Sequence, residues 1–113
     1  DKSSSHVVSG APLPVVGALI RRCSAFLSTD SGLGHVASAV GIRTIAIFGP
    51  AQWSRTAPYG PLGSHLALGL SCSPCLKYPF ESTHSRIRCN IGYRCLTDLS
   101  PQRVIDALTH ILK

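Results

Sequence analysis

Short apolar runs alternate with helical stretches in the first half of this chain, and few folds can bury such a pattern. Residues 25–28 and the β-branched run 43–48 indicate buried strands, and residues 65–70 indicate a third. Apolar residues at helical spacing predict helices over residues 13–22 and 31–40. Helices that alternate with buried strands favour a parallel sheet in an α/β layer fold. Such sheets bind ligands beyond the carboxyl ends of their strands.

The rest of the chain is less regular until its final helix. Gly41 suits the C-terminal stop of the second helix. Residues 49–64 are rich in glycine and proline and predict a loop, whereas residues 71–99 predict an irregular, basic segment with cysteines. Ser100 is a predicted N-cap, with Pro101 at the first helical position. One face of this closing helix carries Val104, Ile105, Leu108, Ile111 and Leu112.

Length and composition predict one domain, residues 1–113, with a basic surface. The chain is 44% apolar and 14% charged, so either its sheet is well buried or part of its apolar surface faces a second domain. The net charge is +6, and Asp30 is the single acidic residue between Lys2 and Phe80. A basic surface favours nucleotide diphosphates, phosphorylated lipids or nucleic acid as partners, unless the charge serves solubility alone. No run reaches the roughly 18 apolar residues of a membrane span, and the polar start predicts no signal peptide.

The segment from Ser28 to His35 carries most of the functional signal, because it joins a predicted strand to the start of a predicted helix. The unpaired amides and the dipole of a helix start favour anions such as a diphosphate. Gly32 and Gly34 each cost a helix ~1 kcal/mol relative to alanine. Either a ligand approaches bare backbone there, or the helix packs tightly on the sheet.

Two side chains flank these glycines. His35 leans back toward the helix start, where its imidazole can reach a bound anion, although a histidine packed against the sheet is the alternative. Asp30 either caps the helix or accepts hydrogen bonds from sugar hydroxyls, and one carboxylate oxygen can serve each role.

Several motifs together resemble the C-terminal domain of ADP-heptose:lipopolysaccharide heptosyltransferases, over roughly residues 7–112. The first is the D-[ST]-G-x-x-H element, residues 30–35. An apolar strand and Phe48-Gly49-Pro50 follow it, then Pro58-Tyr59-Gly60, and Ser100-Pro101-x-x-Val104 near the end. The resemblance implies one half of a GT-B glycosyltransferase, a Rossmann-like three-layer α/β domain with a parallel sheet that holds the nucleotide-sugar donor.

The resemblance also assigns roles. Ser31 and Gly32 would hydrogen-bond phosphate, His35 would stand beside the diphosphate, Asp30 would approach the sugar hydroxyls, and Ala11 would lie in a loop lining the base. The donor would be an ADP-sugar, with ADP-heptose the first choice and a role in lipopolysaccharide core or related glycan synthesis. No cofactor is required by this scheme.

The family's acceptor-binding N-terminal domain and its general base have no counterpart in this sequence. We therefore expect no catalytic residue in this chain, and no sugar transfer by the chain alone. We expect a lipid-linked anionic saccharide to be a partner of the whole enzyme, and we do not expect nucleic acid to bind. An apolar face left uncovered by a missing partner domain would favour self-association. The expected location is the bacterial cytoplasm, at most peripheral to the inner membrane.

Four of the five cysteines form the pattern C-x2-C-x13-C-x5-C, at Cys72, Cys75, Cys89 and Cys95. Structural zinc, disulfides and free thiols all remain open for this set. Cys23, at the end of the first helix, is predicted to be a buried apolar filler. The same segment also carries cations, which suit either a solvated loop, the interpretation we favour, or contact with a phosphorylated lipid core. They are Lys77, Arg86, Arg88 and Arg94.

Two rival functions are less consistent with the sequence. A sugar-nucleotide 2-epimerase would follow Asp-Ser-Gly with a second glycine and acidic residues, but Leu33-Gly34-His35 follows here. A stand-alone nucleotide-binding module, or a zinc-ribbon nucleic-acid module without catalysis, fits the charge and the cysteines. The zinc ribbon, however, leaves the apolar strands and the helix-start glycines unexplained.

Overall fold

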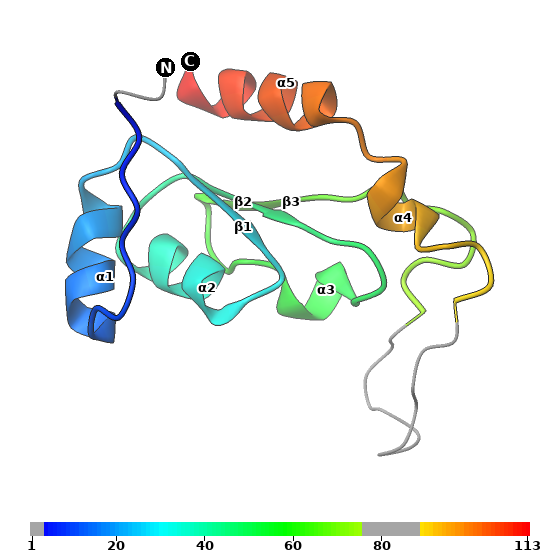
Figure 1. The fold of residues 1–113 in the computed structure, drawn as a ribbon, viewed down its shortest axis with the longest axis horizontal. Coiled ribbons are helices and arrows are strands. Elements are labelled where there is room, and N and C mark those ends of the chain that lie inside the picture. The colour runs from blue at the N-terminus through cyan, green and yellow to red at the C-terminus, as the bar shows by residue number, and fades with distance from the viewer. Residues whose placement is uncertain (1–3, 76–88) are drawn as a thin grey trace.

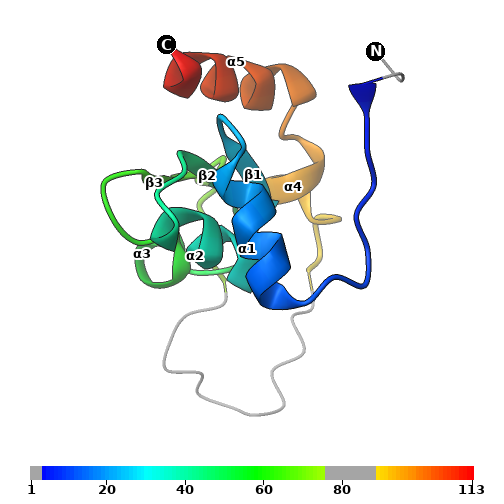
Figure 2. The same ribbon diagram turned by 90° about the vertical axis from the view of Figure 1, so that its left-hand side faces the viewer.

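The computed structural model describes residues 4–75 and 89–113, and its centre is a parallel three-stranded sheet in the order β1-β2-β3. The strands are β1 (Phe26–Thr29), β2 (Thr44–Ile47) and β3 (Gly63–Leu66). Helices α1 (Leu13–Arg21), α2 (Gly32–Ala39) and α3 (Trp53–Thr56) lie on one side of the sheet, and α5 (Pro101–Leu112) lies on the other (Figures 1 and 2). A short helix, α4 (Arg94–Thr97), precedes α5. The predicted three-layer α/β fold with a parallel sheet is confirmed.

Strand β2 is the centre of the sheet, and its residues are the most buried. Phe26 of β1 pairs with Thr44, and Thr44 pairs with Gly63 of β3. Thr44, Ile45 and Ala46 are at most 2% exposed, as expected for a parallel strand covered on both faces. The predicted positions of β1 and β2 are therefore correct to within one residue at each end.

The third strand begins earlier than the sequence indicated, at Gly63 rather than at His65, and it ends at Leu66 rather than at Leu70. Glycine is a poor strand former, so local propensity pointed away from residue 63. Tertiary packing requires glycine there, because a Cβ atom would overlap the Pro58 carbonyl oxygen. The predicted loop 49–64 also contains the one-turn helix α3, and the predicted irregular segment contains α4.

The predicted helix ends agree well with the structure. Gly41 has φ +85°, the left-handed conformation that follows a helix end, and α2 ends at Ala39. The Ser100 hydroxyl accepts a hydrogen bond from the Arg103 amide at 3.3 Å, which confirms Ser100 as the N-cap of α5.

Packing outside the sheet centre is incomplete. No residue of α5 is fully buried, and Ile105 and Leu112 of its predicted apolar face are 52% and 49% exposed. Leu27, on the edge strand β1, is 41% exposed. In the part of the chain that is described, no helix has both the length and the apolar character needed to cross a bilayer.

The prediction for Cys23 is wrong, because this residue is exposed. Helix α1 ends at Arg21, and the amide of Cys23 then bonds the Ile20 carbonyl at 2.9 Å in the turn that follows. This turn directs the cysteine outward, with its sulfur 3.5 Å from the Leu19 carbonyl oxygen.

Candidate functional site

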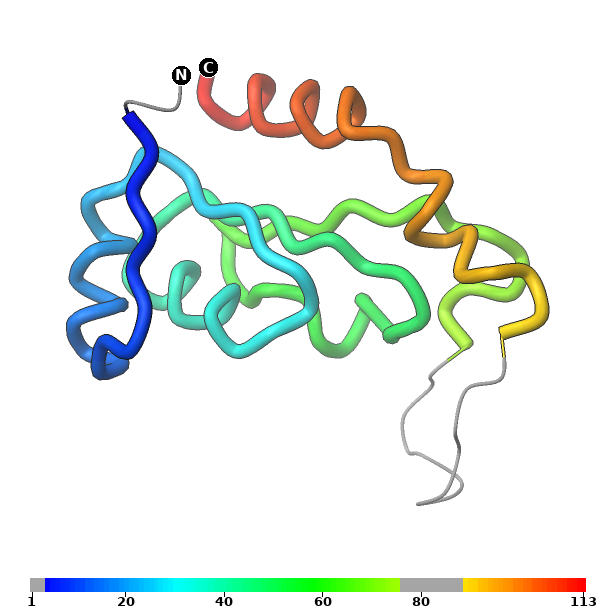
Figure 3. The backbone as a smooth tube through the Cα atoms, in the orientation of Figure 1, coloured from blue at the N-terminus to red at the C-terminus, as the bar shows by residue number. Residues whose placement is uncertain are grey.

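The three strands run in the same direction, so the segments that leave them gather at one edge of the sheet (Figure 3). These strands end at Thr29, Ile47 and Leu66. We call this the carboxyl edge. The start of α2 lies here, since only Asp30 and Ser31 separate β1 from α2. This is where parallel α/β sheets place their ligands.

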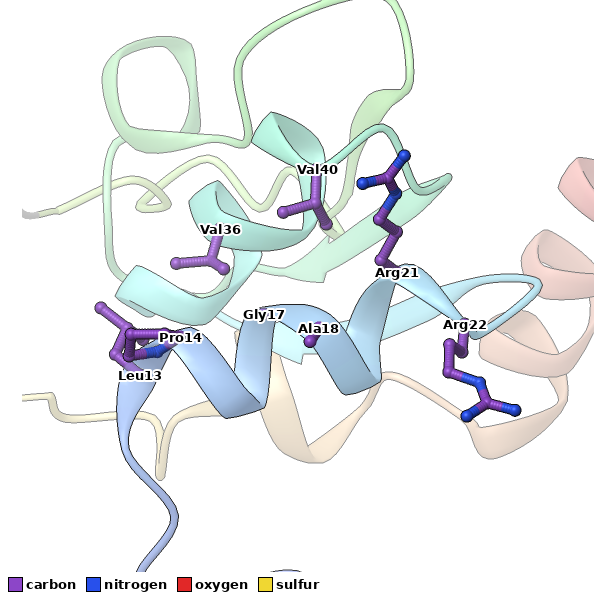
Figure 4. A pocket seen from close by; sticks show the side chains of 8 residues that line it. All are labelled: Leu13, Pro14, Gly17, Ala18, Arg21, Arg22, Val36 and Val40. Carbon is purple, nitrogen blue, oxygen red and sulfur yellow. The ribbon is translucent and has the colours of Figure 1, made fainter.

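Helices α1 and α2 lie side by side, with Val36 Cγ1 3.6 Å from the position of a Cβ atom on Gly17. Figure 4 shows Val36 and Val40 of α2 facing the side of α1 that carries Leu13, Gly17 and Arg21. Ala11 directly precedes Pro12, the N-cap of α1, and is half-buried.

Ser31, and not Asp30, is the N-cap of α2, so the capping role considered for Asp30 is wrong. The Ser31 backbone is extended, with φ −153° and ψ 162°, and its side chain makes no capping hydrogen bond. The Gly34 amide bonds the Ser31 carbonyl at 3.2 Å. Asp30 is exposed one residue earlier. The first-turn amides therefore have no side-chain cap, and the carboxylate of Asp30 is left for other partners.

The two glycines of α2 have different physical explanations. A Cβ atom on Gly34 would lie 2.8 Å from the Ser28 Oγ and 3.4 Å from the Pro58 Cγ, so tight packing on β1 accounts for this glycine. A Cβ atom on Gly32 would meet nothing within 4 Å. Only Gly32 therefore presents open backbone at the helix start.

Ser28, the residue under this helix, lies in the segment that the sequence indicated but was given no role of its own. Its Oγ is buried and has no hydrogen-bond partner among the described residues. An unsatisfied buried hydroxyl costs about 1–3 kcal/mol, so this atom is a source of instability directly beneath Gly34. Nothing in the sequence distinguishes Ser28 from an ordinary strand serine.

His35 is exposed, so it does not pack against the sheet. The buried positions of α2 are Gly34 and Ala37, and Gly34 lies against Ser28 of β1. A histidine one turn into the helix, with its side chain leaning toward the helix start, stands on the solvent side of the same opening.

An aromatic group near the carboxyl edge was also missed by the sequence analysis. The Trp53 and His65 rings stack with centroids 5.8 Å apart and planes at 20°, and Phe48 meets His65 edge-on at 6.3 Å. These residues come from α3, from β3 and from the position directly after β2, so only the fold brings them together.

The structure also brings the cysteines of the irregular segment into one neighbourhood. Burial raises the pKa of the Cys95 thiol, and charge on Cys75, Cys89 and Cys72 raises it further. All five cysteines are free thiols. Among the described residues, no three histidine, cysteine or carboxylate side chains already stand as a metal site. Of the four cations predicted in this segment, Arg94 pairs with Asp98 at 2.7 Å, and the other three lie outside the described residues.

A separate pocket of about 650 Å³ lies between α1 and α2 (Figure 4). Apolar side chains and two arginines line it: Leu13, Pro14, Gly17, Ala18, Arg21, Arg22, Val36 and Val40. None of the predicted donor-binding residues contributes to this pocket, so it is distinct from the helix start at the carboxyl edge.

The layered parallel fold is that of a Rossmann-like fragment of a GT-B glycosyltransferase. Residues 4–84 match the model of glycosyltransferase family 9 (heptosyltransferase), and the chain belongs to this family.

Curated relatives agree. The chain is 32% identical over 92 residues to lipooligosaccharide heptosyltransferase 2 of Campylobacter jejuni subsp. jejuni serotype O:2, covering 80% of this chain and 26% of that protein. It is 35% identical over 94 residues to lipopolysaccharide heptosyltransferase 1 of Pseudomonas aeruginosa, covering 78% of this chain and 26% of that protein. It is 31% identical over 94 residues to lipopolysaccharide heptosyltransferase 2 of Escherichia coli (strain K12), covering 83% of this chain and 25% of that protein. The chain thus spans about a quarter of the length of these relatives. No solved structure matches it.

Proposed function

We propose that this chain is the donor-binding part of a heptosyltransferase of lipopolysaccharide core synthesis, and that its donor is ADP-heptose. The relatives are named lipopolysaccharide or lipooligosaccharide heptosyltransferases, which supports the reaction class. The observation that carries the donor-binding role is the open backbone at Gly32, at the uncapped start of α2 on the carboxyl edge of a parallel sheet. That arrangement suits a diphosphate, because first-turn amides and the helix dipole both favour anions.

Each predicted residue has a role in this proposal. Ser31 and the Gly32 amide hydrogen-bond the diphosphate, which they can reach because no side-chain cap competes. His35, exposed at the same opening, donates a hydrogen bond to a phosphate oxygen. Asp30 accepts hydrogen bonds from the sugar hydroxyls, and Ala11 lines the base at the start of α1.

The rest of the enzyme then supplies the acceptor site and the general base. Asp30 is the only carboxylate in residues 4–75, so one group cannot both hold the donor sugar and deprotonate an acceptor hydroxyl. A lipid-linked anionic saccharide is the acceptor class that suits a chain of net charge +6. This chain alone binds donor and transfers no sugar.

Titration calorimetry of the full chain tests the proposal with ADP-heptose, ADP, a UDP-sugar and a short DNA duplex. We expect the order ADP-heptose, then ADP, with no measurable binding of the UDP-sugar or the DNA. Gly32→Leu should abolish binding of both adenine nucleotides, because its side chain fills the opening.

Asp30→Asn should reduce the advantage of ADP-heptose over ADP and leave ADP binding unchanged. Asp106→Asn, which removes a carboxylate from α5, is the matched control and should bind like the unmodified chain. Equal binding of ADP-heptose by the unmodified chain and Gly32→Leu would refute the proposed site.

A further inference from the structure

The turn that follows β2 connects two cysteine-bearing segments that are distant in sequence. The amide of Cys75 donates to the Pro50 carbonyl at 3.0 Å, and the Ser73 hydroxyl donates to the Gly49 carbonyl at 2.6 Å. These two bonds fasten the Cys72–Cys75 segment to the Gly49-Pro50 turn.

Cys95 approaches the same turn from α4. It is only 7% exposed, and its sulfur lies 3.1 Å from the position of a Cβ atom on Gly49. The Leu96 Cγ would be 2.6 Å from that atom, so only glycine permits this contact. The Gly49-Pro50 turn therefore contacts both cysteine-bearing segments.

Cys89 is linked to α4 by a backbone-to-sulfur bond. The amide of Tyr93, the N-cap of α4, donates to the Cys89 sulfur at 3.2 Å. Gly92 and Tyr93 both have left-handed backbones, with φ +65° and +56°, which turn the chain between Cys89 and α4. The Cys89 sulfur is therefore held against the start of α4, the helix that carries Cys95.

We propose that Cys72, Cys75, Cys89 and Cys95 bind one structural zinc ion beside the Gly49-Pro50 turn. Four thiolates are a complete tetrahedral ligand set for zinc, and the first pair has the two-residue spacing of zinc-binding loops. The sulfurs are free but not yet at ligand positions, so the ion draws the two segments together as it binds. With all four positions filled by protein, this zinc has a structural role and takes no part in sugar transfer.

Metal analysis of the freshly purified full chain tests this inference without any assay of sugar binding. We expect one zinc per chain, and cobalt substitution should give the strong visible absorption of tetrahedral cobalt bound to thiolates. Chelation should release the metal, lower the melting temperature and make four further thiols reactive.

Variants identify the ligands. Cys72→Ser changes an exposed residue and should abolish stoichiometric zinc binding without loss of the core, and Cys95→Ser should do the same at a buried position. Cys23→Ser is the matched control, because Cys23 is exposed in the turn after α1, and this variant should retain one zinc. Five thiols titrating freely in metal-free protein that binds no added cobalt would overturn the inference. So would the reduced mass of a disulfide in freshly purified protein.

Discussion

The contact between Gly34 and Ser28 gives the sharpest test of how α2 packs on β1. In Gly34→Ala, the new methyl group would lie 2.8 Å from the Ser28 Oγ, a separation that side chains do not tolerate. Overpacking of this kind costs about 1–3 kcal/mol, and alanine returns ~1 kcal/mol of helix propensity. We therefore expect a net loss of about 0–2 kcal/mol in the free energy of unfolding.

Removal of the hydroxyl should reverse this effect. Ser28→Ala eliminates a buried oxygen without a hydrogen-bond partner and should stabilise the chain by about 1 kcal/mol. In the double variant, the methyl group of residue 34 then meets only the Pro58 Cγ at 3.4 Å and the Cβ of residue 28 at 3.9 Å. The double variant should therefore be the most stable of the four proteins, with a coupling energy of about 1–3 kcal/mol.

Denaturant unfolding of the unmodified chain, the two single variants and the double variant measures this coupling from the transition midpoints. The comparison holds as long as the slope of the free energy of unfolding against denaturant concentration is the same in all four proteins. Gly32→Ala is the matched control, because it adds the same methyl group where nothing lies within 4 Å, and it should not couple to Ser28→Ala. Additivity of Gly34→Ala and Ser28→Ala to within about 0.5 kcal/mol would show that the helix does not press on the strand as described.

Other substitutions test the remaining elements. Ser100→Ala should cost α5 about 1 kcal/mol, because the Arg103 amide loses its cap, and Ser100→Asp should retain the stability in the same unfolding assay. Asp30→Ala should leave the free energy of unfolding within about 0.5 kcal/mol, since Ser31 is the cap, and a loss of about 1 kcal/mol or more would return the capping role to Asp30. In chelator-treated protein at pH 8, iodoacetamide should modify Cys95 more slowly than Cys23, because a raised pKa lowers the thiolate fraction. The rate at Cys95 should recover only at higher pH, and mass spectrometry would refute this if both cysteines reacted equally at pH 8.

The candidate site was predicted from sequence in its location but not in its details. The alternation of strand and helix fixes a loop between β1 and α2 at the carboxyl edge, so the position of residues 30–35 followed directly. Which residue caps α2 did not follow, because Asp30 and Ser31 are both good caps and the path of the chain chooses between them. The stack of Trp53 on His65 was also out of reach, since it joins residues from a short helix and an edge strand.

The sequence by itself determined the order of the three strands and of α1, α2 and α5, the class of fold and the helix ends at Gly41 and Ser100, because each of those signals acts within a few residues. Tertiary structure alone decided that Gly34 is a packing glycine while Gly32 is open, and that β3 begins at Gly63. It also decided that Cys23 faces solvent. Those outcomes depend on which atoms the fold brings within a few ångströms across the sheet and its helices. No local propensity encodes such distances.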